Sequence, residues 1–229
     1  MASMKLEKIT SRAGRRDDDA CGTAHGLELL GERWALLVVR ELMLGPRRFG
    51  DLRASLPGLS ANVLTQRLEQ LEAAGVAVRR RLPPPASVQV YDLTDWGREA
   101  EPVISELGRW AARSPTHDPT LPLSPVSMML SLRTMFDAGK AGEARTALGF
   151  RFGAERFVVR VADGVLTATR EEPDGVEAMV TGTPEAVAAA VYGEGAWPPA
   201  GLTVEGEAEA FRRFTQWFEL PAKAETRAG

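Results

Sequence analysis

The chain has 229 residues, 44% of them hydrophobic, so it is long enough for two modest hydrophobic cores. It carries a formal net charge of −3 and one cysteine, which excludes an intrachain disulfide and fits a reducing cytoplasm. We find no long apolar run, signal sequence, metal-ligand spacing around His25 and His117, phosphate-binding glycine loop or serine nucleophile elbow. We therefore expect a cytoplasmic protein that is not an enzyme, with no metal or cofactor.

Residues 1–19 are expected to form a flexible N-terminal arm, because they include the charged run at 15–19. Cys21 follows at the start of a predicted helix. A helix N-terminus lowers a thiol pKa, and Arg15 and Arg16 lie nearby in sequence, which favours the reactive thiolate. Cys21 is therefore a redox candidate, with a small buried hydrophobe as the more common role of a free cysteine.

The next segment predicts two helices joined by a tight turn. Phe49 and Leu52 face inward in a short first helix, Pro57-Gly58-Leu59 forms the turn, and Ser60 is placed to cap the second helix. Two helices with this connection make a helix-turn-helix.

The second helix, within residues 59–71, has two different faces. Asn62 and Gln66 lie opposite its apolar stripe, which consists of Leu64, Leu68 and Leu71. Asn and Gln amides place a donor beside an acceptor, the arrangement that pairs with an adenine edge in the major groove. Such a pattern alone is more often an ordinary surface helix, so the prediction of a DNA recognition helix depends on its neighbours.

Those neighbours predict a wing and a local positive charge. Residues 76–82 and 87–93 read as two strands around Pro83-Pro84-Pro85-Ala86, with three arginines where a hairpin meets phosphates. Residues 40–81 contain eight arginines and four acids, whereas residues 116–229 carry 11 basic and 16 acidic side chains. Nucleic-acid binding is therefore assigned to the first half.

These motifs resemble the HxlR-type family of bacterial winged-helix transcription regulators over about residues 20–112. The resemblance rests on the runs 21–34 and 45–52, on Leu-Thr-Gln-Arg-Leu at 64–68, and on Tyr-Asp-Leu-Thr at 91–94 with Gly97. It implies a homodimer on a partly palindromic operator, with recognition helices in the major groove and wings over the backbone. Asn62 departs from the family, which often has Lys or Arg there. The DNA-binding residues predicted together are Arg47, Arg48, Ser60, Asn62, Thr65, Gln66, Arg67, Arg79, Arg80, Arg81 and Gln89.

A long helix is predicted at residues 94–111, with Val103, Leu107 and Trp110 on one stripe. A small winged-helix module cannot bury every such face, so we expect this stripe to pack on a symmetry mate or on the partner's N-terminal helix. The alternative is packing on the second domain of the same chain. Residues 20–113 are thus assigned to DNA binding and dimerisation.

Residues 114–125 contain four prolines and are expected to form a semi-rigid linker before a second domain at 126–221 and a tail at 222–229. The pattern of the second domain is α+β. Its predicted helices are 126–136, 183–192 and 208–218, and its predicted strands are 148–152, 156–161, 165–170, 178–183 and 202–206.

This second pattern resembles sterol-carrier-protein-like domains over about residues 126–220, on the runs Thr-Gly-Thr-Pro-Glu at 181–185 and Leu-Thr-Val-Glu-Gly-Glu at 202–207. The resemblance implies a five-stranded sheet and helices around an apolar cavity for a lipid-like or aromatic molecule. Adaptable methionines and aromatic rings suit such a pocket, although the same residues serve equally as ordinary core. The candidate lining residues are Met128, Met129, Leu132, Met135, Phe136, Phe211, Phe214, Trp217 and Phe218.

The sequence therefore predicts a winged helix-turn-helix followed by a sterol-carrier-like α+β domain. The predicted function is a homodimeric, sequence-specific transcriptional regulator, expected to be a repressor, with operator DNA and an apolar small-molecule effector as partners. Two alternatives stay open. The second domain is a purely structural or dimerisation element, with any sensing done by Cys21, or the protein carries a lipid-like ligand.

Overall fold

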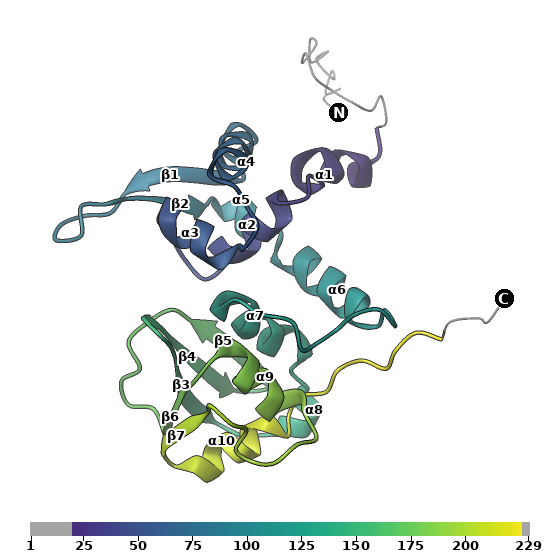
Figure 1. Cartoon of the computed structure of the whole chain (residues 1–229), viewed down its shortest axis with the longest axis vertical. Coiled ribbons are helices and arrows are strands. Elements are labelled where there is room, and N and C mark those ends of the chain that lie inside the picture. The colour runs from purple at the N-terminus through teal and green to yellow at the C-terminus, as the bar shows by residue number, and fades with distance from the viewer. Residues whose placement is uncertain (1–19, 226–229) are drawn as a thin grey trace, which may run out of the picture.

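The computed structural model describes residues 20–225, in two domains stacked along the long axis of the molecule (Figure 1). The predicted arm at 1–19 and the last four residues of the predicted tail lie outside the described residues. Within the described range, no helix has the length and apolar character needed to cross a membrane.

The first domain is a winged helix-turn-helix, as predicted. Its core lies between α2, α3 and α4, and β1 pairs antiparallel with β2 to form the wing. Its elements in chain order are α1 (Gly22–Leu30), α2 (Ala35–Leu42), α3 (Phe49–Ser55), α4 (Ala61–Ala73), β1 (Ala77–Arg81), β2 (Gln89–Leu93), α5 (Asp95–Arg98) and α6 (Glu101–Ala112).

One helix predicted in this domain is interrupted in the structure. The single helix expected at 94–111 is two helices, α5 and α6, separated at Glu99 and Ala100. Pro102 lies in the first turn of α6. A proline is accommodated there because the first turn needs no backbone N–H partner, whereas in a continuous helix it would remove a hydrogen bond.

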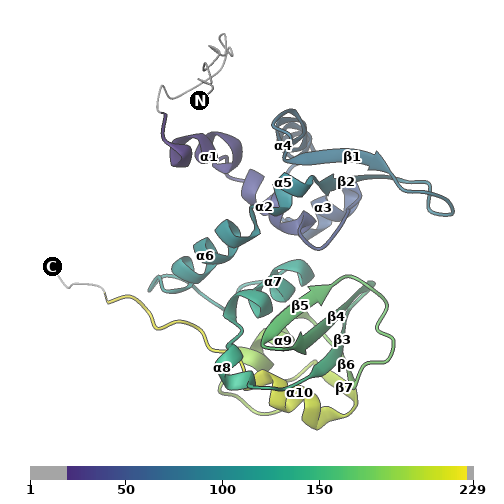
Figure 2. The ribbon, with the colours of Figure 1, turned by 180° about the vertical axis from the view of Figure 1, so that it is seen from behind.

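The second domain contains the predicted five-stranded sheet, in the order β5-β4-β3-β6-β7, with β3 and β6 parallel and the other pairs antiparallel (Figure 2). Asp163 and Gly164 form the predicted hairpin turn, with φ of 53° and 74°. The short helix α8 was not predicted from the sequence. The elements are α7 (Pro125–Met135), α8 (Ala138–Ala141), β3 (Thr146–Phe152), β4 (Glu155–Ala162), β5 (Val165–Thr169), β6 (Ala178–Thr181), α9 (Pro184–Tyr192), β7 (Thr203–Gly206) and α10 (Ala208–Thr215).

The nine residues predicted to line a ligand cavity form much of the packed core of this domain instead. The ring of Phe150 on the sheet lies 6.0 Å from that of Phe211 and 6.3 Å from that of Phe214, and Phe214 lies 4.7 Å from Phe218. Met135, at the end of α7, differs, because it reaches the cavity between the domains that is described below. Interlocking rings thus occupy the space where the sequence had suggested a pocket.

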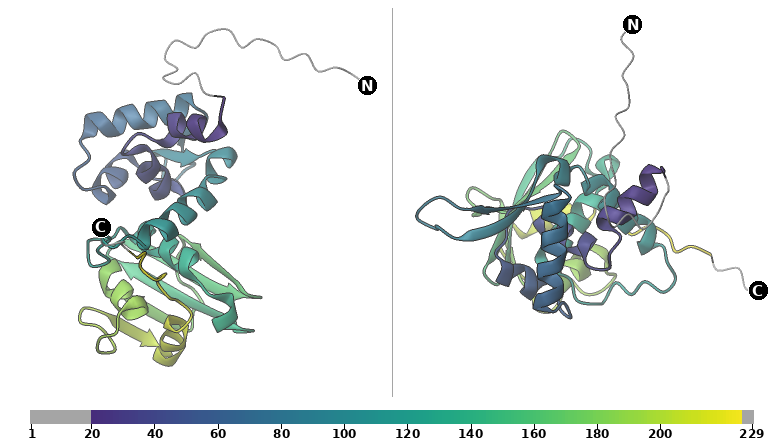
Figure 3. Two further views of the ribbon diagram at one scale, coloured as in Figure 1. Left: turned by 90° about the vertical axis from the view of Figure 1, so that its right-hand side faces the viewer. Right: turned by 90° about the horizontal axis from the view of Figure 1, so that it is seen from above.

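Polar contacts fix the two domains against each other. Arg47 Nη1 donates to Glu155 Oε2 at 2.6 Å, and Ser124 Oγ donates to Glu41 Oε1 at 2.6 Å. Helix α6 packs on α7 between the domains (Figure 3, left), where Arg133 pairs with Glu101 at 2.7 Å. These contacts give the residues of the predicted linker a defined course from one domain to the other.

Candidate nucleic-acid interface

Helix α4 presents the predicted reading face to solvent. Ser60 caps it by accepting a hydrogen bond from Val63 N at 3.3 Å, and the leucine stripe of the helix is buried, whereas Asn62, Thr65 and Gln66 are exposed. Gly58 allows the preceding turn, because its φ is +87°. Helix α4 lies at the end of the molecule away from the second domain, with the wing projecting beside it (Figures 1 and 3).

The wing separates its three arginines onto two faces. Arg79 pairs with Tyr91 and Arg81 with Gln89, so these four side chains share one face of the hairpin, while Arg80 is on the other. Arg79, Arg81 and Gln89 are exposed, and Arg81 Nε also donates to the carbonyl of Ser87 at 3.0 Å. This face offers cationic and amide groups beside α4.

Arg80 has a structural partner that the sequence analysis did not anticipate. Its Nη2 lies 2.7 Å from Asp92 Oδ2, and Arg98 Nη2 lies 2.6 Å from the other oxygen of the same buried carboxylate. Arg80 therefore helps to neutralise Asp92 and ties β1 to β2. Its side chain is 43% exposed at the wing surface, so the guanidinium is partly accessible while it pairs with Asp92.

The prediction that Arg47 contacts DNA is wrong. Its side chain is 6% exposed and holds Glu155 of the second domain, and its Nη2 donates to Ser55 Oγ at 2.9 Å. The backbone of Arg47 pairs with that of Tyr91 at the edge of the wing, with both N–H···O bonds formed. The preceding sequence pattern contains no signal for Glu155, which is 108 residues distant.

The side chains of Arg67 and Ser60 also make interactions within the protein. The Arg67 side chain is 14% exposed, and its Nη2 lies 3.2 Å from Glu32 Oε2, which links α4 to the segment between α1 and α2. Arg67 also donates to Gln70, and the Ser60 hydroxyl serves the helix cap. The exposed members of the predicted set are Arg48, Ser60, Asn62, Thr65, Gln66, Arg79, Arg80, Arg81 and Gln89.

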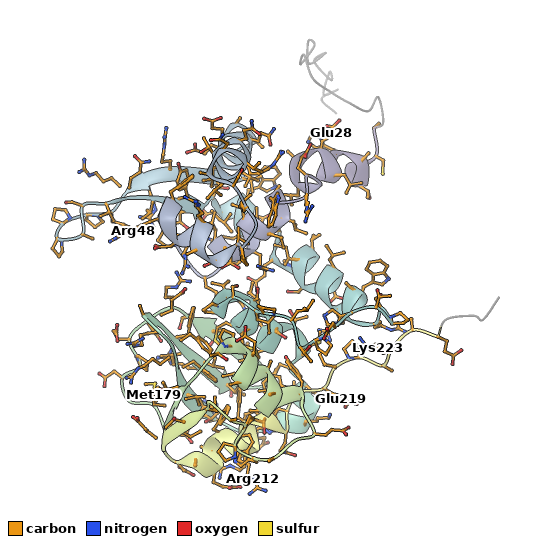
Figure 4. All side chains as sticks on the ribbon, in the orientation of Figure 1. Glu28, Arg48, Met179, Arg212, Glu219 and Lys223 are labelled. Atoms are coloured by element: carbon orange, nitrogen blue, oxygen red, sulfur yellow. The ribbon has the colours of Figure 1, made fainter. Side chains whose placement is uncertain are left out.

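Arg48 illustrates how neighbouring residues divide between two roles. It is exposed at the start of α3, where Asp51 Oδ2 accepts from its backbone N–H at 3.3 Å (Figure 4). Its side chain is accessible to solvent, in contrast to the side chain of Arg47, which is buried against the second domain.

Large apolar side chains on α1 and α6 are exposed to solvent. Val103, Leu107 and Trp110 of α6 are 61%, 44% and 72% exposed, and Leu27 of α1 is 66% exposed. The alternative that this stripe packs on the second domain is wrong, because the other side of α6, including Ala112, faces α7. We call Leu27, Val103, Leu107 and Trp110 the α1/α6 surface.

Cys21 is exposed at the position that precedes α1. Hydrogen bonds from the backbone of Ala24 and then Thr23 lower the pKa of the Cys21 thiol from its ordinary value. The nearby arginines of the sequence argument, Arg15 and Arg16, lie outside the described residues. Among the described residues, these backbone hydrogen bonds and a hydrogen bond from the Thr23 side chain favour the thiolate.

The first domain defines a winged helix-turn-helix protein, and comparison with known proteins gives its family. Residues 29–118 match the HxlR-like helix-turn-helix family. The uncharacterized HTH-type transcriptional regulator YvaP of Bacillus subtilis is 41% identical over 86 residues, which cover 37% of this chain and 79% of YvaP. The HTH-type regulator YodB of B. subtilis is 36% identical over 83 residues, or 36% of this chain and 74% of YodB.

A solved structure of the reduced form of YodB is 32% identical and aligns with 43% of this chain and 98% of its own, with a TM-score of 0.39. The chain belongs to the HxlR-like helix-turn-helix family of DNA-binding transcriptional regulators. The family match ends at residue 118, so the second domain lies almost wholly outside it.

Proposed function

We propose that the protein is a homodimeric repressor that binds a partly palindromic operator through α4 and its wing. The observation that carries the proposal is the exposed pair Asn62 and Gln66 on a capped, firmly packed helix, next to the basic face formed by Arg79 and Arg81. The amides read base edges in the major groove, and the arginines hold the flanking phosphates.

In this proposal the α1/α6 surface is the dimer interface. Burying it against a second copy removes four large apolar side chains from water, which favours association. Two-fold symmetry then places the two copies of α4 about 34 Å apart, one turn of DNA.

The second domain, proposed as residues 126–221 after a linker at 114–125, is the regulatory part of the molecule. Its five-stranded sheet, backed by helices, supports the resemblance to sterol-carrier-like domains. Its contact with α6 gives a route by which an apolar effector changes the dimer and thus the spacing of the recognition helices. In the alternative function, the second domain carries a lipid-like ligand and the protein does not act on an operator.

Binding-site selection with the purified full chain tests this function. We expect an enriched sequence with two related half-sites, and an affinity for it that falls steeply with added salt. Recovery of no preferred sequence, with equal affinity for unrelated duplexes, would contradict operator recognition and leave the carrier alternative.

A second candidate function is electrophile or oxidant sensing through Cys21, favoured by its exposure and its lowered pKa. Diamide or a quinone is added to wild type and to Cys21→Ser, and operator affinity is measured. Loss of binding by the wild type alone supports sensing; identical responses of the two proteins refute it.

A further inference from the structure

A cavity of about 520 Å³ that is partly open to solvent lies between the two domains, lined mainly by α6, the segment 116–123, α7 and α9. This volume is in the range of small-molecule sites, which occur preferentially at domain interfaces. The cavity is distinct from the packed aromatic core of the second domain and from the DNA-facing side of α4.

The walls are mainly apolar, and several hydroxyl-bearing side chains also line them. Side chains from three elements supply the apolar part: Ile104, Leu121, Leu123, Leu130 and Met135. Ser131 Oγ and Tyr192 OH lie 2.8 Å apart and also line the cavity. A hydroxyl pair of this kind offers both a donor and an acceptor to a ligand.

The charges around the cavity favour an uncharged ligand. Arg40 lines it, but its Nη2 lies 2.9 Å from Glu41 Oε1, so its charge is compensated within the protein. Asp118, on the linker, stays charged because hydrogen bonds from Thr120 lower the pKa of its carboxyl, but its side chain is exposed and water screens this charge. Burial raises the pKa of Tyr192 to about 12, so its phenol stays protonated and neutral at pH 7.

Gly108 opens the α6 wall. It lies between Ile104 and Ala112 on the side of the helix that faces the second domain. A Cβ built at Gly108 would meet no described atom within 4 Å outside the helix's own turn. A larger side chain there would therefore enter space next to the cavity rather than clash with the fold.

We propose that this interdomain cavity is the effector site, and that it takes a compact neutral molecule, mainly apolar, with one hydroxyl or carbonyl group that meets Ser131 and Tyr192. The role of this cavity in regulation rests on the proposed function. The ligand contacts α6 from behind the α1/α6 surface, so a ligand that prefers one position of α6 changes the proposed dimer, whereas equal preference changes nothing.

The test uses the full chain and 2-naphthol, a neutral aromatic alcohol, followed by fluorescence titration with naphthalene as the comparison. We expect saturable binding of 2-naphthol to wild type and at least about tenfold weaker binding to Gly108→Leu, because a leucine on this face of α6 enters the open space beside the cavity. Tyr192→Phe should weaken 2-naphthol binding by about fivefold, the effect of one hydrogen bond, and leave naphthalene binding unchanged.

Ala189→Leu is the matched control, because Ala189 is exposed on α9 next to the cavity-lining Ala188. It should bind 2-naphthol as wild type does, and thermal unfolding should show all variants folded. Absence of saturable binding up to about 1 mM, or equal affinities of wild type, Gly108→Leu and Tyr192→Phe, would overturn the site. Operator affinity is measured separately with the same proteins, so failure of DNA recognition is distinguished from failure of the cavity.

Discussion

Arg47 and Arg48 are adjacent in the chain and have opposite roles. The Arg47 guanidinium is buried between the domains against Glu155, and Arg48 is exposed at the start of α3. Sequence alone groups them as one basic pair, because only the distant partner tells them apart. The positive charge available to DNA is correspondingly smaller than the count of arginines suggests.

This division gives a prediction for two matched variants. Arg47→Met should lower the free energy of unfolding by about 2 kcal/mol, because it strands part of a buried ion pair, although Arg170 remains 3.1 Å from Glu155. Arg48→Met should leave stability unchanged and reduce the slope of log affinity against log salt by about 1. Urea unfolding and DNA titrations at several salt concentrations measure both; exchanged effects would refute the assignment.

For single helices and hairpins, the sequence predicted the elements that depend on interactions between residues close in the chain. The Ser60 cap with the leucine stripe gave α4, and Asp163-Gly164 gave the hairpin between β4 and β5. Contacts between elements were beyond such reasoning. The partners Arg47 and Glu155 are 108 residues apart, and Ser131 and Tyr192 are 61 apart, so neither the domain interface nor the cavity had a sequence signal.

The wing offers a prediction at this scale. Arg81→Ala should weaken binding to specific and unrelated DNA alike and reduce the salt slope by about 1, because Arg81 shares the exposed face with Arg79. Arg80→Ala should in addition lower stability by less than about 1 kcal/mol, because Arg80 is 43% exposed and Arg98 still pairs with Asp92. Salt-dependent titrations and thermal unfolding compare the two. Equal stability losses in both variants would contradict the two-faced wing.

In the whole molecule, α6 lies between the interdomain cavity and the proposed dimer interface. One side faces α7 and the cavity, and the other carries most of the α1/α6 surface. The domains are joined by ion pairs and by hydrogen bonds from Lys223 to the carbonyls of Ala112, Ser114 and His117. A change at the cavity therefore has a direct mechanical path to the proposed dimer interface.

The proposed dimer interface gives a further prediction. Trp110→Glu should give a monomer in sedimentation velocity and a large loss of operator affinity, because it places a charge in an apolar interface. Since Trp110 is 72% exposed in the single chain, the fold should be retained. Val165→Glu is the control, because Val165 is 60% exposed on β5 of the second domain and should leave the assembly unchanged. An unaltered assembly in Trp110→Glu would place the interface elsewhere.

In the proposed function the exposed amides of α4 read the DNA sequence, and Gln66→Ala removes one of these amides. Affinities are measured for the selected operator and for each single-base variant of it, with Gln216→Ala, an exposed glutamine in the second domain, as the control. We expect Gln66→Ala to lose about 1–3 kcal/mol of discrimination at one base pair of each half-site and to keep its non-specific affinity. Unchanged discrimination at every position would contradict the assignment of α4 as the recognition helix.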